Sequence, residues 1–337
     1  MSIKVYFSPK QQVDDNNSFS PSAGKPAKVA EQYLDKFGKS IKVVGDFKPV
    51  RPSHIALAHS VDYVRGVLTG RQHNGFGNKK KSVAQSLPYT TGSFYNASEE
   101  AYRTKTITCS LTSGFHHAGY NHGGGFCTFN GLVVSAQILR MKYGCRVGIF
   151  DADQHYGDGT DNIINKLELK YISHYTLGNT GVSSANAEQW LKDLEGILLA
   201  KFADVDVLFY QAGADPWTND PLGGRLTKEQ LRRRDEITFS VVKKLGIGCV
   251  FNLAGGYAKN FQHVLDIHNN TMNEALIASG MGTKYKPATD DITASNGVRN
   301  EIREEVWWNE KPKKIYNEDM TDDELSAYIA DTLGYDL

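Results

Sequence analysis

The sequence predicts an α/β fold, namely a single large domain with a mainly parallel β-sheet flanked by helices. Short runs of apolar and β-branched residues alternate with longer stretches of helical pattern, which is typical of a parallel sheet with crossover helices. Three of the apolar runs also end in polar or glycine-rich segments. Such a pattern indicates strands that are buried on both faces and that present functional residues at their carboxyl ends.

Four apolar runs are the predicted strands. The first covers residues 3–7, and the three sharper ones cover residues 146–153, 206–213 and 248–255. Helical stretches are expected at Gly131–Tyr143 and at residues 187–203 and 227–245. The last of these opens with Thr-Lys-Glu-Gln, a pattern that favours a capped helix start. Strand and helix therefore alternate as a parallel sheet requires.

The predicted domain covers residues 1–287. From about residue 288 the chain becomes charged and contains tryptophan, and residues 321–333 form an amphipathic pattern with a capping start. We therefore expect a C-terminal charged and helical appendage at residues 288–337. The sequence assigns no role to it.

Composition argues against several classes of partner. Lysine plus arginine equals aspartate plus glutamate at 38 each, so the whole molecule should not be drawn strongly to nucleic acid or to an anionic membrane. The two basic triplets, at residues 79–81 and 232–234, are expected to be a solvated loop and a solvated helix face, because no aromatic residues interleave with them. Any specificity for a partner must therefore come from a local site rather than from the net charge of the molecule.

Cysteine use and the first residues suggest a cytoplasmic protein. The four cysteines contain no CxxC pair and are too sparse for a disulfide framework, so we expect reduced thiols. The N-terminal segment lacks an apolar core of signal-peptide length, and no stretch approaches the roughly 18 apolar residues of a membrane span. The sequence does not indicate the oligomeric state.

Polar residues follow three of the predicted strands. Asp151, Asp153 and His155 come at the end of the first sharp strand, Asp215 follows the second, and Tyr257 follows the third. If the strand continues to residue 155, its side chains at 151, 153 and 155 point to one side. Two carboxylates and one imidazole would then share a metal with a coordination position left open, which is typical of catalytic rather than structural zinc.

This aspartate-rich segment has two other interpretations. An EF-hand calcium loop needs glycine at its sixth position, where this chain has Tyr156, so calcium is disfavoured. Aspartate is also a common helix cap, and Asp151 and Asp153 would serve the following helix in that way. The segment alone does not decide between capping and catalysis.

Adjacent histidines in a glycine-rich loop are the second unusual feature. His116 and His117 are too polar to be casual core filling, and a buried imidazole needs a partner. The carboxylates of Asp151 and Asp158 are available for that role. A carboxylate that fixes the tautomer of a histidine makes it a competent general base or acid.

Five short motifs in order identify a resemblance. They are HHA at 116–118, GGFCTFN at 124–130, DADQHYGDGT at 151–160, AGADPWTNDPLGG at 212–224 and AGGY at 254–257. With them, the chain resembles the histone deacetylase superfamily, which includes acetylpolyamine amidohydrolases and has an arginase-like α/β fold. The resemblance covers about residues 50–275, and the stretch 54–68 is similar to an early helix of the family.

The resemblance implies a zinc-dependent deacetylase that acts on acylated amines, whether a protein lysine, a polyamine or another small N-acyl amine. By position it assigns Zn²⁺ to Asp153, His155 and Asp215. His117 would be the general base and His116 its electrostatic partner.

The resemblance also implies the roles of the surrounding residues. Asp151 and Asp158 would hold the two histidines, and Tyr257 would donate a hydrogen bond to the substrate carbonyl. Phe126 would line an acyl tunnel, with the carbonyl of Gly125 contacting the substrate. Some members also place K⁺ near the positions of Asp151, Asp153 and Ser173.

The chain departs from the family pattern in three places. Phe115 is inserted between Gly114 and the double histidine, and Tyr156 replaces a second histidine of the aspartate motif. The tunnel-wall loop is hard to recognise in residues 177–181. Substrate preference is therefore the least specified property.

Three other functions fit the sequence less well. A phosphatase of the haloacid-dehalogenase type would use Asp151 and Asp153, but it prefers threonine or valine where this chain has His155. A dinuclear manganese ureohydrolase needs further carboxylate ligands that are not found. A catalytically silent module that binds acylated amines would need neither His117 nor Tyr257, so an enzyme is favoured.

Overall fold

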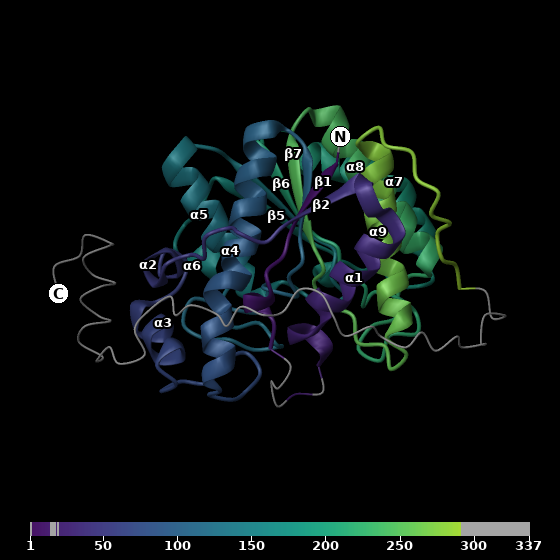
Figure 1. The fold of residues 1–337 in the computed structure, drawn as a ribbon. Coiled ribbons are helices and arrows are strands. Elements are labelled where there is room, and N and C mark those ends of the chain that lie inside the picture. Colours follow the sequence, from purple (N-terminus) through teal and green to yellow (C-terminus); the bar gives the residue numbers. More distant parts are fainter. Residues whose placement is uncertain (1, 14–17, 19, 291–337) are drawn as a thin grey trace.

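The fold is a seven-stranded parallel sheet enclosed between two layers of helices (Figure 1). The computed structural model describes residues 2–13, 18 and 20–290. The predicted fold class is confirmed. The strand order is β2-β1-β3-β7-β6-β4-β5, and the strands are β1 (Ile3–Tyr6), β2 (Ile41–Val44), β3 (Ile107–Ser110), β4 (Val147–Asp151), β5 (Ile172–Thr176), β6 (Val207–Gln211) and β7 (Gly248–Asn252).

Each face of the sheet is covered by its own set of helices. One layer contains α1 (Lys25–Phe37), α7 (Ala187–Lys201), α8 (Lys228–Leu245) and α9 (Gln262–Ala278). The other contains α2 (Pro52–Ile55), α3 (Val61–Leu68), α4 (Lys81–Thr104), α5 (Gly131–Tyr143) and α6 (Asp158–Lys166). Four short 3₁₀ helices complete the elements: Pro9–Gln11, Pro21–Ala23, Gly38–Ser40 and Leu177–Asn179.

Alternation along the strands divides the core. In β6, Leu208 and Tyr210 pack with the first layer, whereas Val207 and Phe209 pack with the second. Because neighbouring side chains point to opposite faces, a fully apolar strand supplies both cores at once. This explains why the predicted strands are unbroken apolar runs.

The predicted strands and helices fall close to the observed ones. The helix expected at 227–245 is α8, and the Thr227 side chain accepts from the Gln230 amide at 3.1 Å while Gln230 accepts from the Thr227 amide at 2.9 Å. The stretch 54–68 is not one helix, however. It divides into α2 and α3 because Ser60 caps a new helix start at the Tyr63 amide.

The expectation that residues 232–234 form a solvated helix face is wrong for one of the three. Arg234 is fully buried, whereas its neighbours Arg232 and Arg233 lie at the surface in ion pairs with glutamates. The charge of the three arginines does not predict that Arg234 is buried. Three consecutive residues span most of a helical turn, so one of them faces the sheet.

The predicted appendage lies almost wholly outside the described residues, and so does its helix at 321–333. Of the appendage the structure describes only residues 288–290. The Ala288 amide donates to Asn270 Oδ1 at 2.9 Å, and the Asp290 carboxylate accepts from Trp217 Nε1 and from the Lys228 amide, each at 2.7 Å. Residues up to 290 are thus bonded to α8 and α9.

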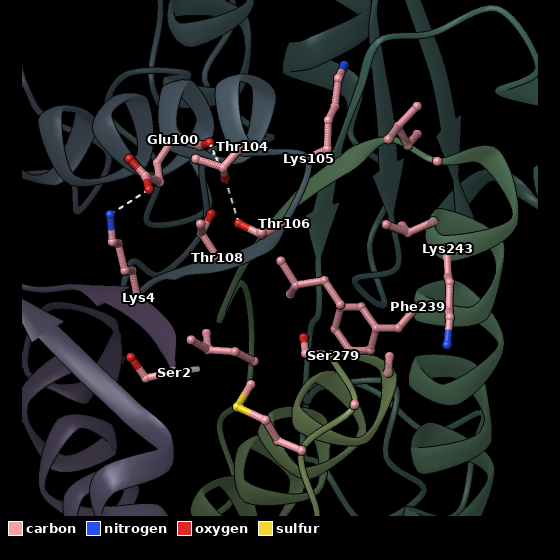
Figure 2. A pocket seen from close by; sticks show the side chains of 18 residues that line it. Ser2, Lys4, Glu100, Thr104, Lys105, Thr106, Thr108, Phe239, Lys243 and Ser279 are labelled. Atoms are coloured by element: carbon pink, nitrogen blue, oxygen red, sulfur yellow. Dashed lines mark hydrogen bonds and ion pairs between the residues drawn. The ribbon is translucent and has the colours of Figure 1, made fainter.

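A large cavity opens at the amino-terminal edge of the sheet, near the starts of β1, β3 and β7 (Figure 2). It has a volume of about 760 Å³ and an apolar floor that includes Ile3, Ile107 and Ile247. None of the predicted site residues lines it. Within the described part of the chain, no helix has the length and apolar character needed to cross a membrane.

Candidate functional site

Three loops meet at the carboxyl edge of the sheet, opposite the large cavity. Asp151, the last residue of β4, is the register partner of Gln211, the last residue of β6. Gln211 is in turn the partner of Asn252, which ends β7. Parallel strands that end in step deliver the segments that follow them to one place, where ligands bind in open α/β sheets.

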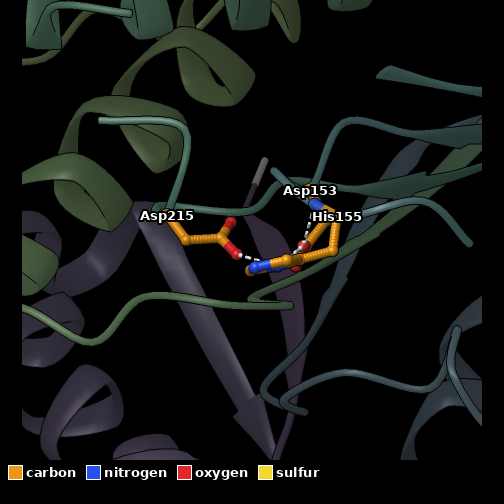
Figure 3. A group of neighbouring side chains, drawn as sticks. All are labelled: Asp153, His155 and Asp215. Atoms are coloured by element: carbon orange, nitrogen blue, oxygen red, sulfur yellow. Dashed lines mark hydrogen bonds and ion pairs between the residues drawn. The ribbon is translucent and has the colours of Figure 1, made fainter. Parts of the chain in front are cut away.

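Asp153, His155 and Asp215 point toward one another across this edge (Figure 3). One potential ligand atom from each lies within 4.8 Å of the other two. The His155 Nδ1 is 3.2 Å from Asp153 Oδ1 and 3.1 Å from Asp215 Oδ2. The expected alternation along a continuing strand is wrong, because β4 ends at Asp151 and a turn carries Asp153 and His155.

Backbone amides surround the two carboxylates. Asp153 accepts from the amides of His155 at 3.0 Å and Gly255 at 2.8 Å, and Asp215 accepts from the Gln154 amide at 3.2 Å. The capping interpretation fails here, because α6 begins at Asp158 and no side chain caps it. Backbone amides of the loops that follow β4 and β7 thus donate hydrogen bonds to the acidic side chains of the loops that follow β4 and β6.

Gly255 allows the close approach of the two carboxylates. A Cβ atom added at Gly255 would lie 2.3 Å from Asp215 Oδ2 and 2.8 Å from Asp153 Oδ2. Real Cβ contacts are essentially never shorter than 3.0 Å. Any larger residue at this position would therefore displace a carboxylate.

The residues at this centre fit a metal cation. Burial and the charge of Asp153 raise the pKa of Asp215 to about 7. Asp215 Oδ2 is buried, and its one potential donor near at hand among the described residues is the His155 Nδ1 at 3.1 Å. Two carboxylates and an imidazole form a donor set suited to a divalent ion, which would relieve the repulsion between the acids.

The paired histidines flank this centre. His116 Nδ1 lies 2.7 Å from Asp151 Oδ2, and His117 Nδ1 lies 2.6 Å from Asp158 Oδ1. The two imidazole centroids are 4.1 Å apart. Asp151 is fully buried and also accepts from Gln211 Nε2 at 3.1 Å, so it does not offer the exposed nucleophile that a phosphatase would need.

The two imidazoles have opposite electrostatic environments. Burial disfavours a charge on His116, but the carboxylates of Asp151 and Asp153 outweigh it and raise its pKa to about 9. Burial and the neighbouring charge of His116 lower the pKa of His117, against the opposing effect of Asp158. At neutral pH His116 is therefore a cation beside a neutral His117.

Aromatic side chains contact one another beside the centre. The ring centroids of Phe126 and Tyr257 are 5.8 Å apart, and those of Phe76 and Phe126 are 6.0 Å apart. Burial and the charges of Asp153 and Asp215 raise the pKa of Tyr257 well above its usual value, so its phenol keeps its proton. A Cβ atom on Gly125 would lie 2.4 Å from the His117 ring, so Gly125 lies against that imidazole.

The departures from the family pattern are accommodated. Phe115 is buried in the helical layer and makes an edge-to-face contact with Phe94, with the ring centroids 5.4 Å apart. Leu177 is buried, and a Cβ atom on Gly178 would lie 2.0 Å from the His155 carbonyl carbon. The loop at 177–181 thus packs against the backbone of His155.

Three buried residues support the site without having been predicted. The Lys25 Nζ donates to the carbonyls of Ala254 at 2.5 Å and Gly255 at 3.0 Å. His59 lies 2.8 Å from both the Gly119 carbonyl and the Asn130 amide, and Arg234 contacts two carbonyls beside the metal centre. Each of the three residues contacts backbone atoms that are distant from it in the sequence. No local sequence motif therefore marks these residues.

Comparison with known proteins agrees with this arrangement. A model of the histone deacetylase domain matches residues 24–180. The chain is 27% identical over 190 residues to histone deacetylase 2 of Arabidopsis thaliana, a match that covers 50% of this chain and 49% of that protein. It is 28% identical over 172 residues to acetylpolyamine amidohydrolase 2 of Pseudomonas aeruginosa, covering 42% and 48% respectively.

A solved structure has the same fold. The crystal structure of the HDA15 HD domain superposes with a TM-score of 0.68 at 17% identity, covering 83% of this chain and 91% of that one. The family model and these relatives support a place for the chain in the histone deacetylase superfamily. Its match spans about half the length of the two named relatives. This similarity supports hydrolase activity.

Proposed function

We propose that this protein is a zinc-dependent deacetylase that removes acetyl or related acyl groups from amines such as the lysine side chain. The observation that carries the proposal is the convergence of two buried carboxylates and an imidazole beside the paired imidazoles of His116 and His117. We assign Zn²⁺ to Asp153, His155 and Asp215. The chemistry that Zn²⁺ supplies at such a site, when bound, is Lewis acidity, which makes water a competent nucleophile at neutral pH.

His117 is the proposed general base. Its Nδ1 lies 2.6 Å from the Asp158 carboxylate, which favours the tautomer with the proton on Nδ1 and leaves the lone pair on Nε2. Burial and the positive charge of His116 lower the pKa of His117 and favour its neutral form. His117 can thus take a proton from attacking water and return it to the leaving amine, so that a carboxylate and a free amine result.

Tyr257 is the proposed oxyanion donor. Its phenol keeps its proton in the field of the nearby carboxylates and can donate a hydrogen bond to the amide oxygen as negative charge develops there. Phe126 and Tyr257 supply an apolar wall for the stem of the amine or the acyl chain. We assign the carbonyl of Gly125 to contact with the substrate.

Further parts of the proposal concern ions, location and partners. A second ion, K⁺, is proposed near Asp151, Asp153 and Ser173 by similarity to the family. All four cysteines are buried and unpaired, which supports a reducing, cytoplasmic location. The proposed partner is an acylated amine, with neither nucleic acid nor membrane required.

Hydrolysis of an acetyl-lysine reporter, measured together with bound zinc, tests the function. We expect zinc at one ion per chain and turnover that His117→Ala removes without removing zinc. Zinc binding without turnover of any acylated amine would instead favour a silent binding module. A side-by-side panel of acetyl-lysine peptides, acetylpolyamines and small N-acyl amines would identify the substrate class.

A further inference from the structure

Arg234 is a fully buried cation in helix α8, directly behind the loops that carry the two acidic residues of the metal centre. Its Nη1 donates to the carbonyl of Ala152 at 3.1 Å and to the carbonyl of Gly213 at 2.8 Å. Ala152 immediately precedes Asp153, and Gly213 lies two residues before Asp215. One nitrogen thus joins the β4 and β6 loops at the point where both leave the sheet.

The sheet itself does not make this connection. The last ladder-like bond between the two segments runs from the Ala152 amide to the Gln211 carbonyl at 3.0 Å. Beyond it no backbone hydrogen bond joins the two segments among the described residues, and the two carbonyls need a donor that backbone pairing does not supply. Arg234 provides that donor from another element.

The guanidinium is itself held on its other side. Arg234 Nε donates to Asp235 Oδ1 at 2.9 Å, and Asp235 Oδ2 accepts from the hydroxyl of Thr271 in α9 at 2.6 Å. The phenol of Tyr210 in β6 also donates to Asp235 Oδ1. Residues of α8, α9 and β6 therefore fix the orientation of the guanidinium. Because the guanidinium is planar and rigid, it restricts the positions of the two carbonyls that it binds.

A buried ion pair of this kind is a costly way to fill a core. Replacing such pairs by apolar residues of similar volume is often neutral or stabilising, so stability alone does not account for Arg234. Its contacts are instead concentrated on the two loops whose acidic side chains must approach each other. A fixed positive charge behind two like-charged carboxylates also lessens their repulsion.

We propose that Arg234 is a positioning residue that sets the separation of the Asp153 and Asp215 carboxylates by tying the Ala152 and Gly213 carbonyls to one guanidinium. The inference rests on the proposed metal centre. It predicts that Arg234 governs the geometry and affinity of that centre even in the absence of any substrate. Residues that orient metal ligands typically change metal affinity by about 10- to 100-fold when removed.

Cobalt binding provides the test. The purified full chain is stripped of metal and titrated with Co²⁺ in competition with a chelator, and its visible absorption spectrum is recorded at saturation. The variants are Arg234→Met and Arg234→Lys, the second of which keeps the charge but lacks the rigid guanidinium that Asp235 holds in place. Arg233→Met is the matched control, because its side chain lies at the surface in an ion pair with Glu188. Circular dichroism and thermal melting report on folding.

We expect Arg234→Lys to fold and to bind Co²⁺ about 10-fold more weakly, with a shifted absorption band that reports an altered ligand field. Arg234→Met, where folded, should bind about 100-fold more weakly, and Arg233→Met should match the wild type. A wild-type spectrum and affinity in Arg234→Lys would overturn the proposal, even with a lower melting temperature. Loss of folding in Arg234→Lys would do so too, because the residue would then serve the fold as a whole. A wild-type chain that binds no Co²⁺ would refute the metal centre itself, and this inference with it.

Discussion

Replacing Gly255 by alanine should damage the proposed metal centre directly, because the added methyl group would meet both carboxylates. The added Cβ would lie 2.3 Å from Asp215 Oδ2, whereas ordinary contacts begin at 3.4 Å. The carboxylate oxygen must then retreat by about 1.1 Å. Displacements of about 1 Å in a reacting centre cost roughly 100-fold in rate, and disturbed ligand orientation costs about 10- to 100-fold in metal affinity.

The assay for Gly255→Ala has two parts. Zinc affinity is measured by competition with a chromophoric chelator, and kcat/KM is measured with an acetyl-lysine reporter at saturating zinc. Gly196→Ala in α7 is the control, because a Cβ there meets nothing within 4 Å. Wild-type zinc affinity and turnover in Gly255→Ala would refute the reasoning, since the close packing of Gly255 against both carboxylates would then have no consequence.

Three further predictions concern individual residues. His117→Ala should lower kcat by about 100- to 10,000-fold while zinc affinity, measured by competition, stays near the wild-type value; a large loss of zinc would instead make His117 part of the metal centre. Tyr257→Phe should lower kcat by about 100- to 1,000-fold in steady-state assays, and a loss confined to KM would exclude the oxyanion role. Burial lowers the pKa of Lys25 from 10.5 to about 8, so between these values the unfolded chain holds a proton that the folded chain has released. We therefore expect the metal-free wild type to become more stable relative to Lys25→Met as the pH rises across that window. The difference between their free energies of unfolding, measured by urea titration, should increase by up to about 3 kcal/mol. A difference that stays constant or decreases would show that Lys25 does not titrate as its burial implies.

Much of the fold and of the site was predictable because both depend on local patterns. Buried parallel strands are continuous apolar runs, so β4, β6 and β7 were found, and their polar ends marked the functional edge of the sheet. The edge strand β5, Ile172–Thr176, has a half-exposed middle and was missed. Helix α4 was missed as well, because Pro88 and several threonines weaken its helical pattern.

The remainder depends on tertiary contacts that leave no local trace. Nothing near Lys25 or Arg234 in the sequence indicates that each binds carbonyls more than twenty residues away. The expected alternation of Asp151, Asp153 and His155 was wrong because the strand ends at the first of them. The three residues Asp153, His155 and Asp215 converge all the same, because neighbouring strands end in register.

The central claim is that Asp153, His155 and Asp215 together bind one zinc ion. Diffraction from crystals grown with Zn²⁺, recorded on both sides of the zinc absorption edge, measures this directly. The account predicts one strong anomalous peak at roughly 2.0–2.2 Å from a carboxylate oxygen of each aspartate and from a ring nitrogen of His155. A peak bound elsewhere, or none at this edge of the sheet at full zinc saturation, would contradict it.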